Sequence, residues 1–79
     1  MAKSVRVYSA QACPYCHLLI EFLKENDVAF ENADIEKDRK AFRELREKSG
    51  QEAVPVIDID GVMIIGYDRK KIADALGIK

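Results

Sequence analysis

The chain has 79 residues, and its 13 Lys plus Arg and 14 Asp plus Glu give a formal net charge of −1. This length suits one small domain over residues 1–79. Basic and acidic residues are interleaved along the chain, so we expect neither nucleic acid nor an anionic membrane surface as a partner.

The sequence carries no signal for export or for membrane insertion. No apolar run approaches the about 18 residues of a spanning helix, and the first residues lack the apolar stretch of a secretory leader. The two cysteines, Cys13 and Cys16, are too few to form the disulfide cross-links of a small secreted protein. We therefore expect a cytoplasmic protein, and since no patch of charge marks an interface, we expect a monomer.

The first half of the chain predicts a strand, a helix and a second strand. Apolar and polar residues alternate over residues 4–8, as in a strand. Pro14 suits the first turn of a helix, and apolar residues at steps of three and four extend this helix to about residue 26. After the turn at Asn26 and Asp27, a second strand is expected over about residues 29–34.

The second half predicts a helix, a hairpin and a last helix. Residues 37–48 are heavily charged but keep Phe42 and Leu45 three apart, and Gly50 follows as a helix stop. Strands over residues 54–60 and 62–65 flank the turn signal Asp60-Gly61, and Asp68 can cap a helix ending at residue 77. The order β-α-β-α-β-β-α predicts an α/β fold with a mixed four-stranded sheet.

The cysteine pair lies in the sequence Cys13-Pro14-Tyr15-Cys16, where the first helix is predicted to begin. Unsatisfied N–H groups and the positive end of the helix dipole favour a thiolate there, so we predict Cys13 as the nucleophile. Cys16 lies one turn further on the same face, at a separation that suits a disulfide. We predict that Cys13 attacks a substrate disulfide and that Cys16 resolves the mixed disulfide.

The cysteine pair also allows other interpretations. Cys13-x-x-Cys16-His17 also matches a c-type haem attachment motif, but that site needs export, and the alternating strands and helices argue against a small cytochrome. Structural zinc needs four ligands, which the two thiols and His17 do not complete. An iron–sulfur cluster shared across a dimer, or a regulatory thiol module, stays open.

The motifs Cys13-Pro14-Tyr15-Cys16, Val54-Pro55 and Gly66-Tyr67-Asp68, in this order and spacing, resemble those of glutaredoxins. The resemblance covers essentially the whole chain. It implies a thioredoxin-like fold and a dithiol enzyme that reduces protein disulfides and glutathione mixed disulfides. It also implies glutathione as co-substrate, disulfide-containing or glutathionylated proteins as partners, and no tightly bound cofactor or metal.

The resemblance further implies where glutathione binds. The peptide bond before Pro55 is cis in this family, which turns the Val54 backbone toward Cys13, so that it can pair with an incoming cysteine. The start of the last helix offers N–H groups for the γ-glutamyl carboxylate, and Asp68 offers a carboxylate for its ammonium. The residues implied to line this site are Tyr15, Ala53, Val54, Pro55, Gly66, Tyr67 and Asp68.

Three positions depart from the family pattern. Ala10 stands where many glutaredoxins carry a lysine, Ile65 replaces the first glycine of a common pair, and Ala53 replaces a threonine. Arg39 or Gln51 could supply the missing contact to glutathione. Residues 66–72 also resemble the glutaredoxin-like donors of ribonucleotide reductase, so thioredoxin reductase stays open as the electron source.

Overall fold

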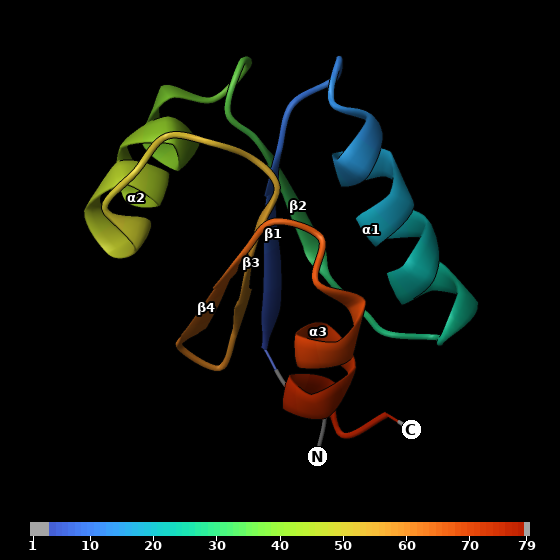
Figure 1. The fold of residues 1–79 in the computed structure, drawn as a ribbon. Coiled ribbons are helices and arrows are strands. Elements are labelled where there is room, and N and C mark those ends of the chain that lie inside the picture. Colours follow the sequence, from blue (N-terminus) through green and yellow to red (C-terminus); the bar gives the residue numbers. More distant parts are fainter. Residues whose placement is uncertain (1–3, 79) are drawn as a thin grey trace.

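The computed structural model describes residues 4–78, and its seven elements follow the predicted order (Figure 1). The sheet order is β2-β1-β3-β4, with β1 parallel to β2 and antiparallel to β3, and with β3 antiparallel to β4. The predicted α/β fold with a mixed four-stranded sheet is confirmed. The elements are β1 (Val5–Ser9), α1 (Pro14–Glu25), β2 (Glu31–Asp34), α2 (Arg39–Ser49), β3 (Val56–Ile59), β4 (Val62–Ile65) and α3 (Arg69–Leu76).

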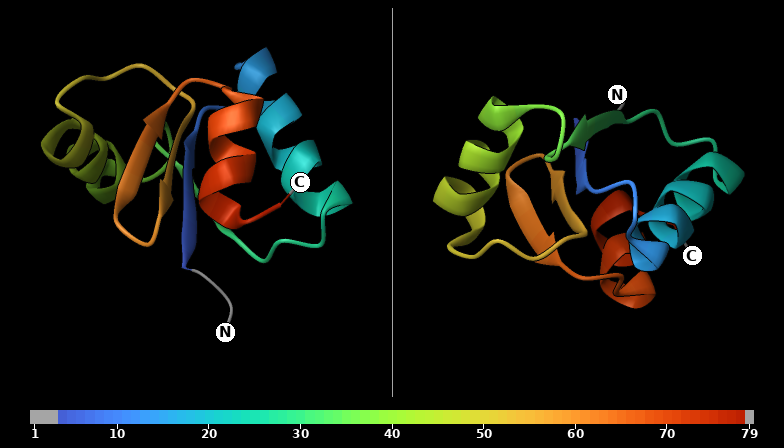
Figure 2. Two further views of the ribbon diagram at one scale, coloured as in Figure 1. Left: turned by 60° about the horizontal axis from the view of Figure 1, so that its bottom comes forward. Right: turned by 90° about the horizontal axis from the view of Figure 1, so that it is seen from above.

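The sheet lies between two helical layers, with α1 and α3 on one face and α2 on the other (Figure 2). Alternation along β1 sends Val5 and Val7 toward α1 and α3 and sends Tyr8 toward α2. The buried core under α1 and α3 consists of Val5, Val7, Leu19, Phe22, Leu23, Ile57, Ile59, Ile64 and Ile72. The smaller core under α2 consists of Tyr8, Ala33, Ala41, Leu45 and Val56. No helix within residues 4–78 is long and apolar enough to cross a membrane.

Several observed elements begin later than predicted, for local reasons. Helix α2 begins at Arg39 because the Asp38 carboxylate caps it, accepting hydrogen bonds from the Lys40 and Ala41 N–H groups at 3.0 and 3.4 Å. Strand β3 begins at Val56, after the Val54–Pro55 bond, because proline has no N–H to give to a ladder. Strand β2 is shorter at its start, and the preceding Phe30 packs against the larger core.

The hairpin between β3 and β4 turns as the sequence predicts. Asp60 and Gly61 both have left-handed backbone angles, with φ of 51° and 92°, which suits a two-residue turn of this hand. The Asp58 carboxylate accepts a hydrogen bond from the Gly61 N–H at 2.8 Å. The turn sets the register that pairs Ile57 with Ile64, and both side chains join the core under α1 and α3.

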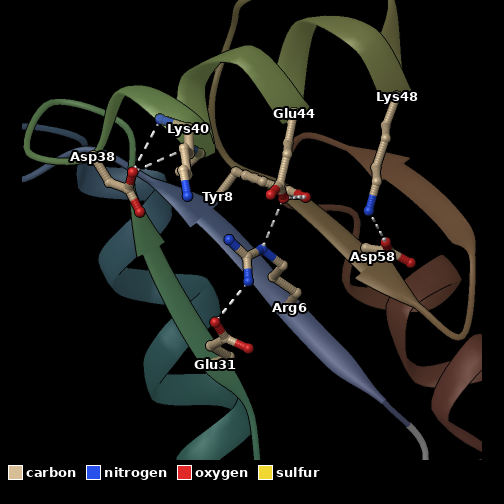
Figure 3. A network of polar contacts seen from close by, with 9 residues as sticks. Arg6, Tyr8, Glu31, Asp38, Lys40, Glu44, Lys48 and Asp58 are labelled. Carbon is tan, nitrogen blue, oxygen red and sulfur yellow. Dashed lines mark hydrogen bonds and ion pairs between the residues drawn. The ribbon is translucent and has the colours of Figure 1, made fainter.

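A polar network joins α2 to the sheet (Figure 3). The Arg6 guanidinium lies 2.6 Å from the Glu31 carboxylate and 3.4 Å from that of Glu44. The buried Tyr8 hydroxyl donates a hydrogen bond to Glu44 at 3.1 Å, and burial together with this bond raises the pKa of the phenol. A buried hydroxyl without a partner is costly, so Glu44 makes the burial of Tyr8 under α2 possible.

Leu45→Ala tests the dependence of the fold on the core under α2. Leu45 is fully buried, so the change should lower the free energy of unfolding by about 2–5 kcal/mol. Val62→Ala, at a residue that is 54% exposed, should change it by less than about 1 kcal/mol. Urea unfolding followed by circular dichroism measures both, and equal losses would contradict this account of the core.

Candidate active site

Cys13 caps the helix that it precedes. Its backbone is extended, with φ of −103° and ψ of 108°, and its Sγ accepts a hydrogen bond from the Cys16 N–H at 3.2 Å. Pro14 fills the first helical turn, where an N–H is not needed. The sulfur therefore lies at the positive end of the α1 dipole with a backbone donor aimed at it.

Cys16 lies behind Cys13 and is fully buried, whereas Cys13 is partly exposed. Both are free thiols. Burial raises the pKa of the Cys16 thiol to about 12, and the hydrogen bond and negative charge of Cys13 add to this effect, while a backbone hydrogen bond with Ala10 acts in the opposite direction. Of the two thiols, Cys13 is the one that a substrate can reach, and Cys16 stays protonated at neutral pH.

The loop before β3 supplies the second side of the site. The Val54–Pro55 peptide bond is cis, as the resemblance implies, and the Cys13 Sγ lies 3.9 Å from the Val54 carbonyl oxygen. The Pro55 carbonyl accepts a hydrogen bond from the Gly66 N–H at 2.8 Å. This bond holds the chain after β4 beside the Val54 and Pro55 segment, so two of the sequence motifs meet next to the dithiol.

The start of α3 forms the third side. Asp68 is the N-cap, and its carboxylate accepts a hydrogen bond from the Lys71 N–H at 3.1 Å. Gly66 has φ of 84°, a left-handed conformation that a residue with a side chain rarely adopts. The Tyr67 ring meets Phe22 of α1 edge to face, with centroids 6.4 Å apart. This contact fixes the motif around Asp68 against the helix that carries both cysteines.

The structure places Tyr15, Gln51 and Arg39 in different surroundings. Tyr15 is 62% exposed, on the first turn of α1. The Gln51 side chain holds its own loop, because it donates to the Ala53 carbonyl at 3.1 Å and accepts from the Ala53 N–H at 2.6 Å. Arg39 is exposed at the first residue of α2. Of the two suggested substitutes for the missing lysine, Arg39 is therefore the free one.

One contact near the dithiol has no signal in the sequence. The His17 ring nitrogen Nε2 lies 2.8 Å from the Gln11 carbonyl oxygen, which ties the loop before Cys13 to the first turn of α1. The Gln11 N–H in turn donates to the Glu36 carboxylate at 3.0 Å. His17 thus positions the loop on the helix surface.

In the part of the chain from residue 4 to 78, no group of three or more His, Cys, Asp or Glu could hold a metal ion.

The raised pKa of Cys16 predicts selective labelling. In the reduced protein near neutral pH, iodoacetamide should modify Cys13 and leave Cys16 unmodified, because the buried thiol stays protonated until the pH approaches about 12. Peptide mapping by mass spectrometry measures the two sites separately. The urea-unfolded protein, in which both thiols are exposed, is the control and should take two labels. Equal labelling of the folded protein would contradict the assignment.

Comparison with known proteins agrees with this geometry. The glutaredoxin family model matches residues 5–64. An uncharacterized glutaredoxin-like 8.6 kDa protein in the rubredoxin operon of Clostridium pasteurianum is 37% identical over 68 residues, which cover 86% of this chain and 91% of that protein. Glutaredoxin 3 of Escherichia coli K12 is 34% identical over 74 residues, covering 94% of this chain and 89% of the relative.

Solved structures extend the likeness to three dimensions. A crystal structure of a mutant of the thioredoxin-like protein BC3987 superposes with a TM-score of 0.93 at 34% identity, covering 96% of this chain and 97% of the other. The family match, the two relatives and this structure all include the dithiol segment and most of the sheet. The chain belongs to the glutaredoxin family of thiol–disulfide oxidoreductases with a thioredoxin-like fold.

Proposed function

We propose that this protein is a dithiol glutaredoxin that reduces protein disulfides and glutathione mixed disulfides, with glutathione as its co-substrate. One observation carries the proposal. Cys13 is partly exposed, its sulfur accepts a hydrogen bond from the Cys16 N–H at 3.2 Å, and the fully buried Cys16 lies behind it. This is an attacking thiol with its resolving partner held one helical turn away.

The proposed reaction uses the two thiols of the protein, the substrate disulfide and two molecules of glutathione as the reductant. The Cys13 thiolate attacks one sulfur of a substrate disulfide, which forms a mixed disulfide and expels the other sulfur as a thiolate that takes up a proton. Cys16 then loses its proton and attacks the Cys13 sulfur, which releases the reduced substrate and leaves a Cys13–Cys16 disulfide. Two glutathione molecules reduce this disulfide and leave as glutathione disulfide.

The start of α1, the loop before β3 and the start of α3 together form the proposed glutathione site. Val54 presents its carbonyl beside Cys13, where the backbone of the glutathione cysteine can pair with it. The N–H groups at the start of α3 suit the γ-glutamyl carboxylate, and the half-buried Asp68 carboxylate suits its ammonium. Tyr15, Ala53, Pro55, Gly66 and Tyr67 complete the proposed lining.

A second candidate electron source is thioredoxin reductase. It is favoured by Ala10, whose methyl group offers no charge where many glutaredoxins carry a lysine, and by Ile65, which is 53% exposed where a glycine is common. Both candidates keep Cys13 as the nucleophile, so they differ only in what reduces the Cys13–Cys16 disulfide.

One assay with two electron sources separates the candidates. Turnover of a small glutathione mixed disulfide is followed by NADPH oxidation, with glutathione plus glutathione reductase in one arm and thioredoxin reductase in the other. We expect turnover in the glutathione arm. Turnover only with thioredoxin reductase would replace the glutathione assignment with the second candidate, and no turnover in either arm would contradict the oxidoreductase proposal.

The two cysteines should have separable roles. Cys13→Ser should abolish every disulfide reduction, because no other exposed thiol remains. Cys16→Ser should keep the turnover of glutathione mixed disulfides, which needs one thiol, and lose the reduction of protein disulfides. The glutathione-coupled assay with a small mixed disulfide and with a disulfide-bonded protein measures both. Equal loss of both activities in Cys16→Ser would contradict this division.

Asp68 offers a test of the glutathione site itself. Asp68→Asn keeps an N-cap of similar quality but removes the charge, so it should raise the KM for glutathione by about tenfold to hundredfold with little change in stability. Asp68→Ala should add a loss of about 1 kcal/mol in the free energy of unfolding. Kinetics and urea unfolding distinguish the two effects. An unchanged KM in Asp68→Asn would leave Asp68 as a helix cap only.

A further inference from the structure

A groove lies between α1 and the start of α3, and of its lining residues only Tyr67 also belongs to the proposed glutathione site. Helices α1 and α3 lie on the same face of the sheet (Figure 2), and Tyr67, just before α3, meets Phe22 in the second half of α1. The groove encloses about 140 Å³, well below the roughly 300 Å³ and more of small-molecule pockets. This volume suits one side chain of a larger partner better than a free metabolite. The groove is lined by Leu18, Glu21, Phe22, Glu25, Tyr67 and Arg69.

Exposed apolar side chains lie on α1 between Cys13 and the groove, of which Leu18 also lines the groove. Tyr15 is 62% exposed and Leu18 is 45% exposed. They lie three residues apart on α1 and therefore on one side of it, next to the helix start that Cys13 caps. Tyr67 lies on the opposite wall. A substrate chain that covers these apolar side chains would remove their surface from water, which favours its binding there.

The far part of the groove carries unpaired negative charge. Glu21 and Glu25 lie one turn apart on α1, and neither has an ion-pair partner within residues 4–78. The cation on the walls is Arg69, whose guanidinium lies over the Phe22 ring, 5.5 Å from its centroid. Two carboxylates thus face one guanidinium, which leaves a net negative charge that a cationic side chain would complement.

We propose that this groove binds the disulfide-bearing segment of a protein substrate, with an apolar side chain on Tyr15 and Leu18 and a lysine or arginine beside Glu21 and Glu25. The proposal rests on the proposed function, because it assumes that Cys13 attacks a disulfide carried by that segment. It adds a substrate class: segments in which the target cysteine is followed by an apolar and then a basic residue.

Single-turnover kinetics of the pre-reduced protein test this selectivity without depending on the electron source. The probes are two synthetic peptides, each with one cysteine in a mixed disulfide with glutathione, followed by leucine and then either lysine or glutamate. A small glutathione mixed disulfide without a peptide is the reference. The wild-type protein should react about threefold to tenfold faster with the lysine peptide, and added salt should reduce this preference.

Three variants locate the effect. The double variant Glu21→Gln with Glu25→Gln should react equally with both peptides. Leu18→Ser should slow both peptides and leave the small mixed disulfide unchanged. Val62→Ser is the matched control, because Val62 is 54% exposed but lies in β4 and not on the groove, and it should change no rate.

Several outcomes would overturn the inference. Equal rates with the two peptides in the wild-type protein would remove the charge selectivity, and slowing of the small disulfide by Leu18→Ser would make Leu18 part of the general site. Self-association that Leu18→Ser abolishes would assign the groove to a second copy of the chain. If the wild-type protein reacts with none of the disulfides, the proposed function itself fails, whereas reaction without peptide selectivity overturns only this inference.

Discussion

The structure of this site depends on one interaction, the hydrogen bond from the Cys16 N–H to the Cys13 sulfur where α1 begins. It caps the helix, places the sulfur at the positive end of the helix dipole and keeps it close to Cys16. The register of the sheet brings the other half of the site to the same edge. Tyr8, near the end of β1, pairs with Val56, the first residue of β3, so the two loops that carry Cys13 and Val54 leave the sheet together.

The helices on the two faces of the sheet are held by different kinds of interaction. Helix α1, which carries both cysteines, packs on the larger apolar core, where burial supplies most of the stabilisation. Helix α2 packs on a smaller core and is joined to β1 through Arg6, Tyr8 and Glu44 (Figure 3). Because Arg6 and Tyr8 alternate with Val5 and Val7, β1 contributes to both layers, and it pairs with β2 on one side and β3 on the other.

Local signals made much of the fold predictable from sequence. The N-cap Asp68, the Asp60-Gly61 turn and the start of α1 at Pro14 each depend on neighbouring residues only, and the structure has them where the sequence predicts them. The His17 contact to Gln11, the use of the Gln51 amide within its own loop and the complete burial of Cys16 depend on tertiary packing. Residue type and spacing carry no information on such contacts, so sequence reasoning missed them.

The causes of the raised Cys16 pKa also order the two steps of the proposed reaction. Burial is the largest cause and persists throughout, but the hydrogen bond and the negative charge contributed by Cys13 last only while Cys13 is unreacted. In the proposed mixed disulfide Cys13 carries no negative charge, so its contribution to the raised pKa of Cys16 is absent while burial remains. The resolving thiol is therefore held protonated before the mixed disulfide forms and becomes easier to ionise afterwards. In the proposed reaction, the burial of Cys16 behind the partly exposed Cys13 thus keeps Cys16 protonated until Cys13 has reacted.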